Sequence, residues 1–386
     1  MRAETSPILG RGFDRAAVDT LDQAFGAGAS PATAVAPGRV TVIGEHVDYA
    51  GGRVVCMAID LVLAVSVRPS ADAKWRVASG VTRVERSEPA MQGDVGDRVF
   101  ACALSLRRRG IDVPPLEIGV AGDLPVAAGL SSSAAVMTAS LVAMLRLCAE
   151  QLTADSLVAA AVTAERDIVG VPNGDMDQRA VVHSRAESVL VLDCSTGTRR
   201  FAPWPWSEIG LLVATSGERH DNLGAGYRAR RTAVERALTL LGVRSCQEIG
   251  DRWGELPAEL QPMARHIATE TRRSDAAAEA LRRGDCEALG HLIDASHESL
   301  RRDFEISTPR IDAMVEAARQ VQGCYGVRLV GGGFGGSVIA LVDHASADRC
   351  AAAMSAVSGI ERGTWLVDSS PGLEVTATDV VGPDRG

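Results

Sequence analysis

The chain has 386 residues, 46% of them hydrophobic and 23% charged, which is enough for about two to three ordinary domains. The formal net charge of −9 argues against a nucleic acid as partner, because binding to a phosphate backbone requires clustered positive charge. Lys74 is the single lysine, so mechanisms that need a Walker A, protein-kinase or Schiff-base lysine are nearly excluded.

Three further absences concern location and cofactors. No stretch approaches the roughly 20 apolar residues of a membrane span, and residues 1–15 contain no apolar signal-peptide core. We therefore expect a cytoplasmic protein without a membrane partner; for the oligomeric state a monomer is expected. The eight cysteines include no Cys-x-x-Cys pair, which favours buried reduced thiols over a zinc or disulfide framework.

The first half of the chain predicts strands alternating with helices. Short apolar and β-branched runs predict strands at residues 39–43, 54–67, 116–120 and 189–192. Long helical patterns cover residues 131–150 and 154–168, the second ended by Gly170 and Pro172. Trp204-Pro205-Trp206 is the expected crossing between two domains, residues 1–203 and 204–386.

The second half predicts several helices and then a pair of strands. Helical patterns cover residues 226–241, 263–283 and 286–302. Thr308 as N-cap and Pro309 in the first turn predict a helix to about Gln320. Further strands are expected at 327–330 and 338–342, so the whole chain predicts an α+β fold.

A turn bounded by glycines follows the strand predicted at 39–43 and concentrates polar side chains. It contains Arg39, Glu45, His46 and Asp48. Singly, each is consistent with a charged surface turn or, for His46, with a structural histidine. Together they suit a polyhydroxylated ligand, because carboxylates accept hydrogen bonds from hydroxyls and an arginine can hold a phosphate.

A Gly/Ser loop lies directly before the helix predicted at 131–150. Its residues are Gly129, Leu130, Ser131, Ser132, Ser133 and Ala134. Backbone amides at a helix N-terminus favour phosphate oxygens, and a serine hydroxyl can reach a magnesium ion. A helix start with a serine N-cap explains the loop equally well.

Two more segments combine glycines with possible function. Residues 170–178 contain Gly174 and Asp177, with Glu165 upstream, and these carboxylates can serve as a base and a metal ligand or merely as caps. The loop 331–336 is consistent with a nearby nucleotide or with closely packed backbone.

The order of these motifs carries a resemblance. Gly-Arg-Val-x-x-Ile-Gly-Glu-His-x-Asp-Tyr is followed by Gly-Leu-Ser-Ser-Ser-Ala, Gly-x-Met-Asp-Gln and Gly-Gly-Gly-Phe-Gly-Gly. The series resembles the galactokinases, within the GHMP family of small-molecule kinases, from about Ala36 to Leu341. The resemblance implies a two-domain fold with an N-terminal half like ribosomal protein S5, a ferredoxin-like C-terminal half and an active site between them.

The resemblance also implies ATP- and Mg²⁺-dependent phosphorylation of the C1 hydroxyl of galactose or a closely related sugar. Asp177 would be the base and Arg39 would favour its ionised form. Glu165 and Ser133, with Ser132 as the alternative, would hold Mg²⁺. ATP would lie on the loop formed by Gly129, Leu130, Ser131, Ser132, Ser133 and Ala134. The sugar would contact Glu45, His46, Asp48, Gly174 and Tyr227.

This chain departs from the galactokinase pattern beside the expected sugar site. Val47 and Ala50 stand where polar side chains are usual, and Arg53, Arg179 and Arg228 are extra cations. The arginines can be solvated surface residues. Alternatively they converge on a second anion, which predicts an acceptor that is already phosphorylated, such as a heptose or C7-cyclitol phosphate of a natural-product pathway.

Two other classes of function are weighed against the kinase. A sugar-sensing relative without activity has no need of Arg39, Ser133, Glu165 and Asp177 together, yet all four are present. A nucleic-acid-binding protein built on the S5-like half conflicts with the acidic net charge. The sequence therefore favours the kinase.

Overall fold

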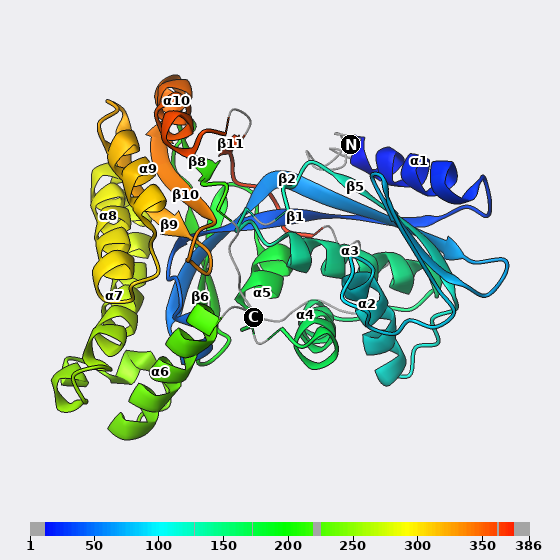
Figure 1. Ribbon diagram of the computed structural model, residues 1–386, viewed down its shortest axis with the longest axis horizontal. Coiled ribbons are helices and arrows are strands. Elements are labelled where there is room, and N and C mark those ends of the chain that lie inside the picture. The colour runs from blue at the N-terminus through cyan, green and yellow to red at the C-terminus, as the bar shows by residue number, and fades with distance from the viewer. Residues whose placement is uncertain (1–11, 127, 172, 219–224, 361–362, 374–386) are drawn as a thin grey trace.

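The computed structural model describes residues 12–126, 128–171, 173–218, 225–360 and 363–373. Its strands form two sheets, one of seven strands and one of four, with helices around both (Figure 1). Among these residues no helix is both long and apolar enough to cross a membrane.

The seven-stranded sheet has the order β4-β3-β5-β2-β6-β7, and β1 pairs with β2 off this path. Its strands are β1 (Ala32–Ile43), β2 (Arg53–Pro69), β3 (Trp75–Ser79), β4 (Thr82–Arg86), β5 (Leu116–Gly122), β6 (Ser188–Asp193) and β7 (Arg199–Pro203). The associated helices are α1 (Phe13–Phe25), α2 (Asp97–Arg108), α3 (Ser132–Leu147), α4 (Ala154–Val162) and α5 (Met176–His183). Helix α3 packs on β1 and β2, whereas α1 covers the other face of β2 and β5. Burial on both faces explains why β2 is apolar along nearly its whole length.

The four-stranded sheet has the order β11-β8-β10-β9. Its strands are β8 (Ile209–Thr215), β9 (Cys324–Val330), β10 (Ser337–Asp343) and β11 (Thr364–Val367). Its helices are α6 (Ala225–Leu241), α7 (Gln261–Arg283), α8 (Cys286–Arg302), α9 (Pro309–Arg319) and α10 (Ala347–Ser358). Helices α8, α9 and α10 pack on this sheet, and α7 packs on α8 and reaches β2 of the other sheet.

The predicted strands and most predicted helices are confirmed, including the N-cap of α9, where the Thr308 hydroxyl accepts from the Ile311 amide at 3.2 Å. The helix expected over 154–168 is wrong in its second part, because α4 ends at Val162 and a π-helix covers Thr163–Val169. The helix expected over 131–150 is shorter, from Ser132 to Leu147. Helices α1, α2, α5 and α10 have no counterpart among the expected elements.

The two halves share their cores. One large apolar cluster joins β1, β2 and α3 to Leu211 and Ile339 of the second sheet, and the other joins Val47 and Val54 to Leu212 and Val327. After β11 the chain also returns to the first half, with backbone hydrogen bonds to β2 and α5. The two sheets divide between Pro203 and Ile209, and the domain boundary at residue 204 stays a prediction.

Candidate active site

A cavity of about 500 Å³ lies where the two halves meet. Its lining from the first half includes the polar turn after β1, the Gly/Ser loop, the π-helix and the start of α5, and from the second half Tyr227, Gly331 and Gly332. Every residue that the resemblance assigns to the site lines this cavity except Ala134, which is fully buried in α3 behind the loop. Segments far apart in the chain thus converge on one site.

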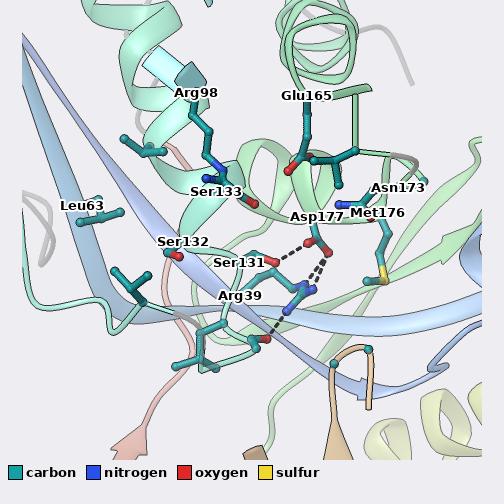
Figure 2. Close-up of a pocket in the computed structure, with 18 of the residues that line it drawn as sticks. Arg39, Leu63, Arg98, Ser131, Ser132, Ser133, Glu165, Asn173, Met176 and Asp177 are labelled. Atoms are coloured by element: carbon teal, nitrogen blue, oxygen red, sulfur yellow. Dashed lines mark hydrogen bonds and ion pairs between the residues drawn. The ribbon is translucent and has the colours of Figure 1, made fainter. Parts of the chain in front are cut away.

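Arg39 and Asp177 form a close ion pair at the centre of the cavity (Figure 2). Nε and Nη2 of Arg39 lie 2.7 and 2.6 Å from Oδ1 of Asp177, and Nη1 donates to the carbonyl of Gly129 at 2.7 Å. The Ser131 hydroxyl donates to Oδ2 of the same carboxylate. Burial would lower the pKa of Arg39, but the charges of Asp177 and Glu45 outweigh it and raise that pKa. The guanidinium therefore stays charged beside the carboxylate.

In the Gly/Ser loop, the side chain of Ser131 does not cap helix α3. Ser131 occupies the N-cap position of α3 in a left-handed conformation, with φ of 56°, and its side chain makes no capping hydrogen bond. The alternative explanation by a serine N-cap is therefore wrong, because the hydroxyl is committed to Asp177. The first amides of α3 are left without a side-chain cap at the cavity wall.

Glu165 lies on the π-helix with its carboxylate directed into the cavity. It is 3% exposed, Oε2 accepts from Nε2 of Gln178 at 2.5 Å, and the Ser133 hydroxyl donates to the same carboxylate. Burial, and then the charge of Asp177, raise the pKa of Glu165. Oε1 of Gln178 is buried without a hydrogen-bond partner among the described residues. The Glu165 carboxylate and the Ser133 hydroxyl are oxygen ligands, which suit a magnesium ion that takes its remaining ligands from phosphates and water.

Glu45 is held by the second half of the molecule. Its Oε1 accepts from the Gly331 amide at 2.9 Å and from Nη2 of Arg328 at 3.2 Å. Burial nevertheless raises its pKa, against the lowering effect of Arg328 and Arg39. The carboxylate is thus fixed in place at the cavity wall.

His46 is neutral and held through both ring nitrogens. Nδ1 lies 2.9 Å from the Tyr49 hydroxyl and Nε2 lies 3.3 Å from the carbonyl of Gly332. A carbonyl only accepts, so Nε2 carries the proton. Burial, reinforced by His266, lowers the pKa of His46 to about 3. The ring packs 5.3 Å from that of Tyr227, which also lines the cavity.

Asp48 is a half-buried carboxylate beside Gly174. Burial, with the charge of Asp177, raises its pKa to about 6. A Cβ at Gly174 would lie 2.3 Å from Oδ2 of Asp48, so a side chain at this position would displace the carboxylate. The Gly/Ser loop also lies beside the glycine-rich loop of the second half, since a Cβ at Gly129 would lie 3.3 Å from the Val330 carbonyl oxygen. Within loop 331–336, a Cβ at Gly333 would lie 2.6 Å from Cβ of Ile306, so close packing explains this glycine, whereas Gly331 and Gly332 line the cavity.

The departures from the galactokinase pattern do not reach the cavity. Val47 and Ala50 are buried in the second apolar cluster and are absent from the cavity wall. Arg53 pairs with Asp193 at 3.4 Å and with Asp275, and Arg179 pairs with Asp175 at 2.7 Å. Arg228 is exposed on α6. None of the three arginines lines the cavity.

Three buried residues behind the polar turn escaped the sequence analysis. Arg328 is fully buried in β9 and donates to the Val42 carbonyl at 2.9 Å as well as to Glu45. Oε1 of Glu270, on α7, accepts from the Gly44 amide at 3.0 Å, and His266 lies 3.2 Å from the Glu45 carbonyl. In the sequence, an arginine that stands alone within the apolar run of β9 could have identified Arg328 as a buried charge that needs partners.

Arg98 was also overlooked. It lies in the first turn of α2 and lines the cavity near Ser133 (Figure 2). It is half-buried, and its Nε has no hydrogen-bond partner among the described residues.

Comparisons with known proteins agree with this geometry. Residues 97–185 match the GHMP kinases N terminal domain, 277–358 the GHMP kinases C terminal domain, and 20–69 the galactokinase galactose-binding signature. The chain is 36% identical to a galactokinase of Roseiflexus sp. over 81% of this chain and 84% of that protein. With the galactokinase of Chloroflexus aurantiacus the identity is 37%, covering 86% and 89%, and with that of Bos taurus it is 33%, covering 83% and 86%.

Solved structures show the same relationship. Lactococcus lactis galactokinase complexed with galactose superposes with a TM-score of 0.86 at 25% identity, covering 93% of this chain and 99% of that one. Methanococcus jannaschii mevalonate kinase, at 17% identity, shares the fold with a TM-score of 0.66 over 89% of this chain and 99% of its own. The chain therefore belongs to the GHMP kinase family and, within it, to the galactokinases.

Proposed function

We propose that this chain, as an ATP-dependent sugar kinase, transfers the γ-phosphoryl group of ATP to the C1 hydroxyl of galactose. The observation that carries the proposal is the position of Asp177, which lies between the Arg39 guanidinium and the Ser131 hydroxyl. That position joins the polar turn, which suits a sugar, to the Gly/Ser loop, which suits a polyphosphate.

In this proposal Asp177 accepts the proton of the C1 hydroxyl. The C1 oxygen then forms a bond to the γ-phosphorus, the bond from that phosphorus to the β–γ bridging oxygen breaks, and ADP leaves. Arg39 keeps Asp177 ionised and offsets charge that develops on the transferred group. Phosphoryl transfer depends mainly on alignment and charge neutralisation, so this pair is sufficient without a lysine.

The remaining site residues divide between the two substrates. The triphosphate would lie on the loop of Gly129, Leu130, Ser131, Ser132, Ser133 and Ala134, against the uncapped amides of α3. The sugar hydroxyls would contact Glu45, His46, Asp48, Gly174 and Tyr227. Glu165 with Ser133, or with Ser132, would hold Mg²⁺. When bound, this ion neutralises phosphate charge and orients the γ-phosphate.

A coupled ADP-release assay tests the proposal. The purified protein would be given ATP with galactose, N-acetylgalactosamine, glucose, a heptose 7-phosphate or a C7-cyclitol phosphate, and the variant Asp177→Asn would serve as the blank. We expect turnover with galactose that the variant lacks. If only a phosphorylated acceptor is turned over, the substrate is a phosphorylated sugar or cyclitol and not galactose. The pairing of Arg53 and Arg179 with carboxylates argues against that outcome.

A further inference from the structure

The cavity is strongly acidic for a site that would bind a polyphosphate. Four carboxylates line it, those of Glu45, Asp48, Glu165 and Asp177. Among the described lining residues only Arg39 and Arg98 carry positive charge. Arg39 is already bound to Asp177 and to the Gly129 carbonyl, so its donors are largely committed.

Arg98, in contrast, has a guanidinium donor that no described residue accepts from. Its Nε is buried and has no hydrogen-bond partner among the described residues, and its guanidinium forms no ion pair there within 4.0 Å. Figure 2 shows the side chain entering the cavity toward Ser133 in the first turn of α3. A buried guanidinium donor without a partner is costly, and a ligand oxygen at this position would satisfy it.

The surroundings of Arg98 favour an anion. The uncapped N-terminus of α3 lies on the same side of the cavity, and the positive ends of helices attract phosphate. The single lysine cannot contribute, because Lys74 pairs with Glu85 and does not line the cavity. The planar fork of an arginine also matches phosphate oxygens in geometry.

We infer that Arg98 contacts a phosphate group of the bound nucleotide and acts as a second cationic ligand of the nucleotide, separate from Arg39. The inference rests on the proposed function, because it presumes that a nucleotide occupies this end of the cavity. Arg98 is therefore a binding residue that determines affinity for the phosphates rather than for the base or the sugar.

A purely structural role makes a different prediction. Arg98 also acts on Glu165 through space, and its charge lowers the pKa of that carboxylate against the effect of burial. If balancing Glu165 were its whole role, removing Arg98 would disturb the site without distinguishing a phosphorylated nucleoside from its nucleoside.

Calorimetric titration of the full-length chain distinguishes these roles. The variants are Arg98→Met, which keeps the apolar stem, and Arg98→Lys, which keeps a charge. Arg108→Met, an exposed arginine on the same helix, is the matched control. The ligands are ADP and galactose, titrated directly, and adenosine, measured by competition with ADP.

We expect Arg98→Met to weaken ADP binding by about tenfold to a hundredfold, the range for losing a charged hydrogen bond. Binding of adenosine and of galactose should stay within twofold, Arg98→Lys should recover part of the loss, and Arg108→Met should match the unmodified chain. Unchanged ADP affinity in Arg98→Met, or an equal loss for ADP and adenosine, would overturn the inference.

The same data separate this inference from the proposed function. If the unmodified chain binds no ADP and transfers no phosphoryl group to galactose, the proposed function fails and the inference fails with it. If the unmodified chain is active but Arg98→Met keeps its ADP affinity, only the inference is overturned.

Discussion

The two ends of the cavity are built in different ways. At the proposed sugar end, lined by the polar turn after β1, Glu45 and His46 are both held by hydrogen bonds with the second half of the molecule. At the proposed nucleotide end, lined by the Gly/Ser loop and Arg98, Nε of Arg98 is buried without a hydrogen-bond partner among the described residues. Val126, which also lines the cavity, is 84% exposed.

This difference shows where the molecule is organised before ligands bind. At the sugar end, buried groups are satisfied within the protein, so their positions are set by the fold. At the proposed nucleotide end, Nε of Arg98 and the uncapped first amides of α3 can be satisfied by a ligand instead. Asp177 lies where the two ends meet and is held by Arg39 and Ser131.

The largest effect is expected at this meeting point. Asp177→Asn removes the proposed base, so kcat for galactose should fall by about 10²- to 10⁴-fold, while ADP and galactose still bind. Steady-state kinetics together with calorimetry measure both quantities. Asp175→Asn is the matched control, since Asp175 pairs with Arg179 and does not line the cavity. A kcat within tenfold of the unmodified chain would remove Asp177 from the proposed role.

The second largest effect is expected for Arg328, which holds Glu45 in place at the proposed sugar end. Arg328→Met leaves Glu45 buried without its cation, so the free energy of unfolding should fall by about 3–5 kcal/mol. Denaturant unfolding measures this change. Arg302→Met, which breaks the pair of the exposed Arg302 with the half-buried Glu298, should cost no more than about 1 kcal/mol. The double variant Glu45→Gln/Arg328→Met should regain part of the loss, and equal instability in single and double variants would contradict this explanation.

A pH dependence is expected at the sugar end and not at His46. Asp48 has a pKa of about 6, raised by burial and by Asp177 and Glu45, and opposed by Arg231. Protonation below pH 6 removes an acceptor charge, so galactose affinity should fall by up to about tenfold at pH 5. His46, with a pKa of about 3, stays neutral in this range.

Calorimetric titration of galactose between pH 5 and 8 measures this dependence, and Asp48→Asn should abolish it. The raised pKa has the opposite effect on folding. The folded chain holds a proton that the unfolded chain has released, so this group's contribution to stability is lost as the pH rises through 6. A galactose affinity that is constant down to pH 5 would show that the charge of Asp48 is not needed for binding.

The smallest effect is expected outside the cavity. Arg179→Met and Arg228→Met should change KM for galactose by less than twofold, because neither residue lines the cavity. The ADP-release assay with galactose and with a heptose 7-phosphate measures both variants. A marked rise in KM for the phosphorylated acceptor alone would restore the hypothesis of a second anion site.

Much of the fold and of the site could be predicted from local sequence. The strands β1, β2 and β10 are apolar along nearly their whole length, and Thr308 and Pro309 mark the start of α9. The π-helix could not be foreseen, because its residues Thr163–Val169 continue a pattern that favours an ordinary helix. Helices such as α2, which are short and half-polar, give too weak a periodic signal to identify alone.

The sequence by itself determined the composition of each motif, because the spacing of its glycines, serines and carboxylates along the chain does not depend on the fold. Only the tertiary structure decided their partners. The carboxylates that neutralise Arg53, the hydrogen bonds of Arg328 to the polar turn, and the burial of Val47 all join segments far apart in the chain. Charge pairing and desolvation depend on distances in space, which spacing along the chain does not specify.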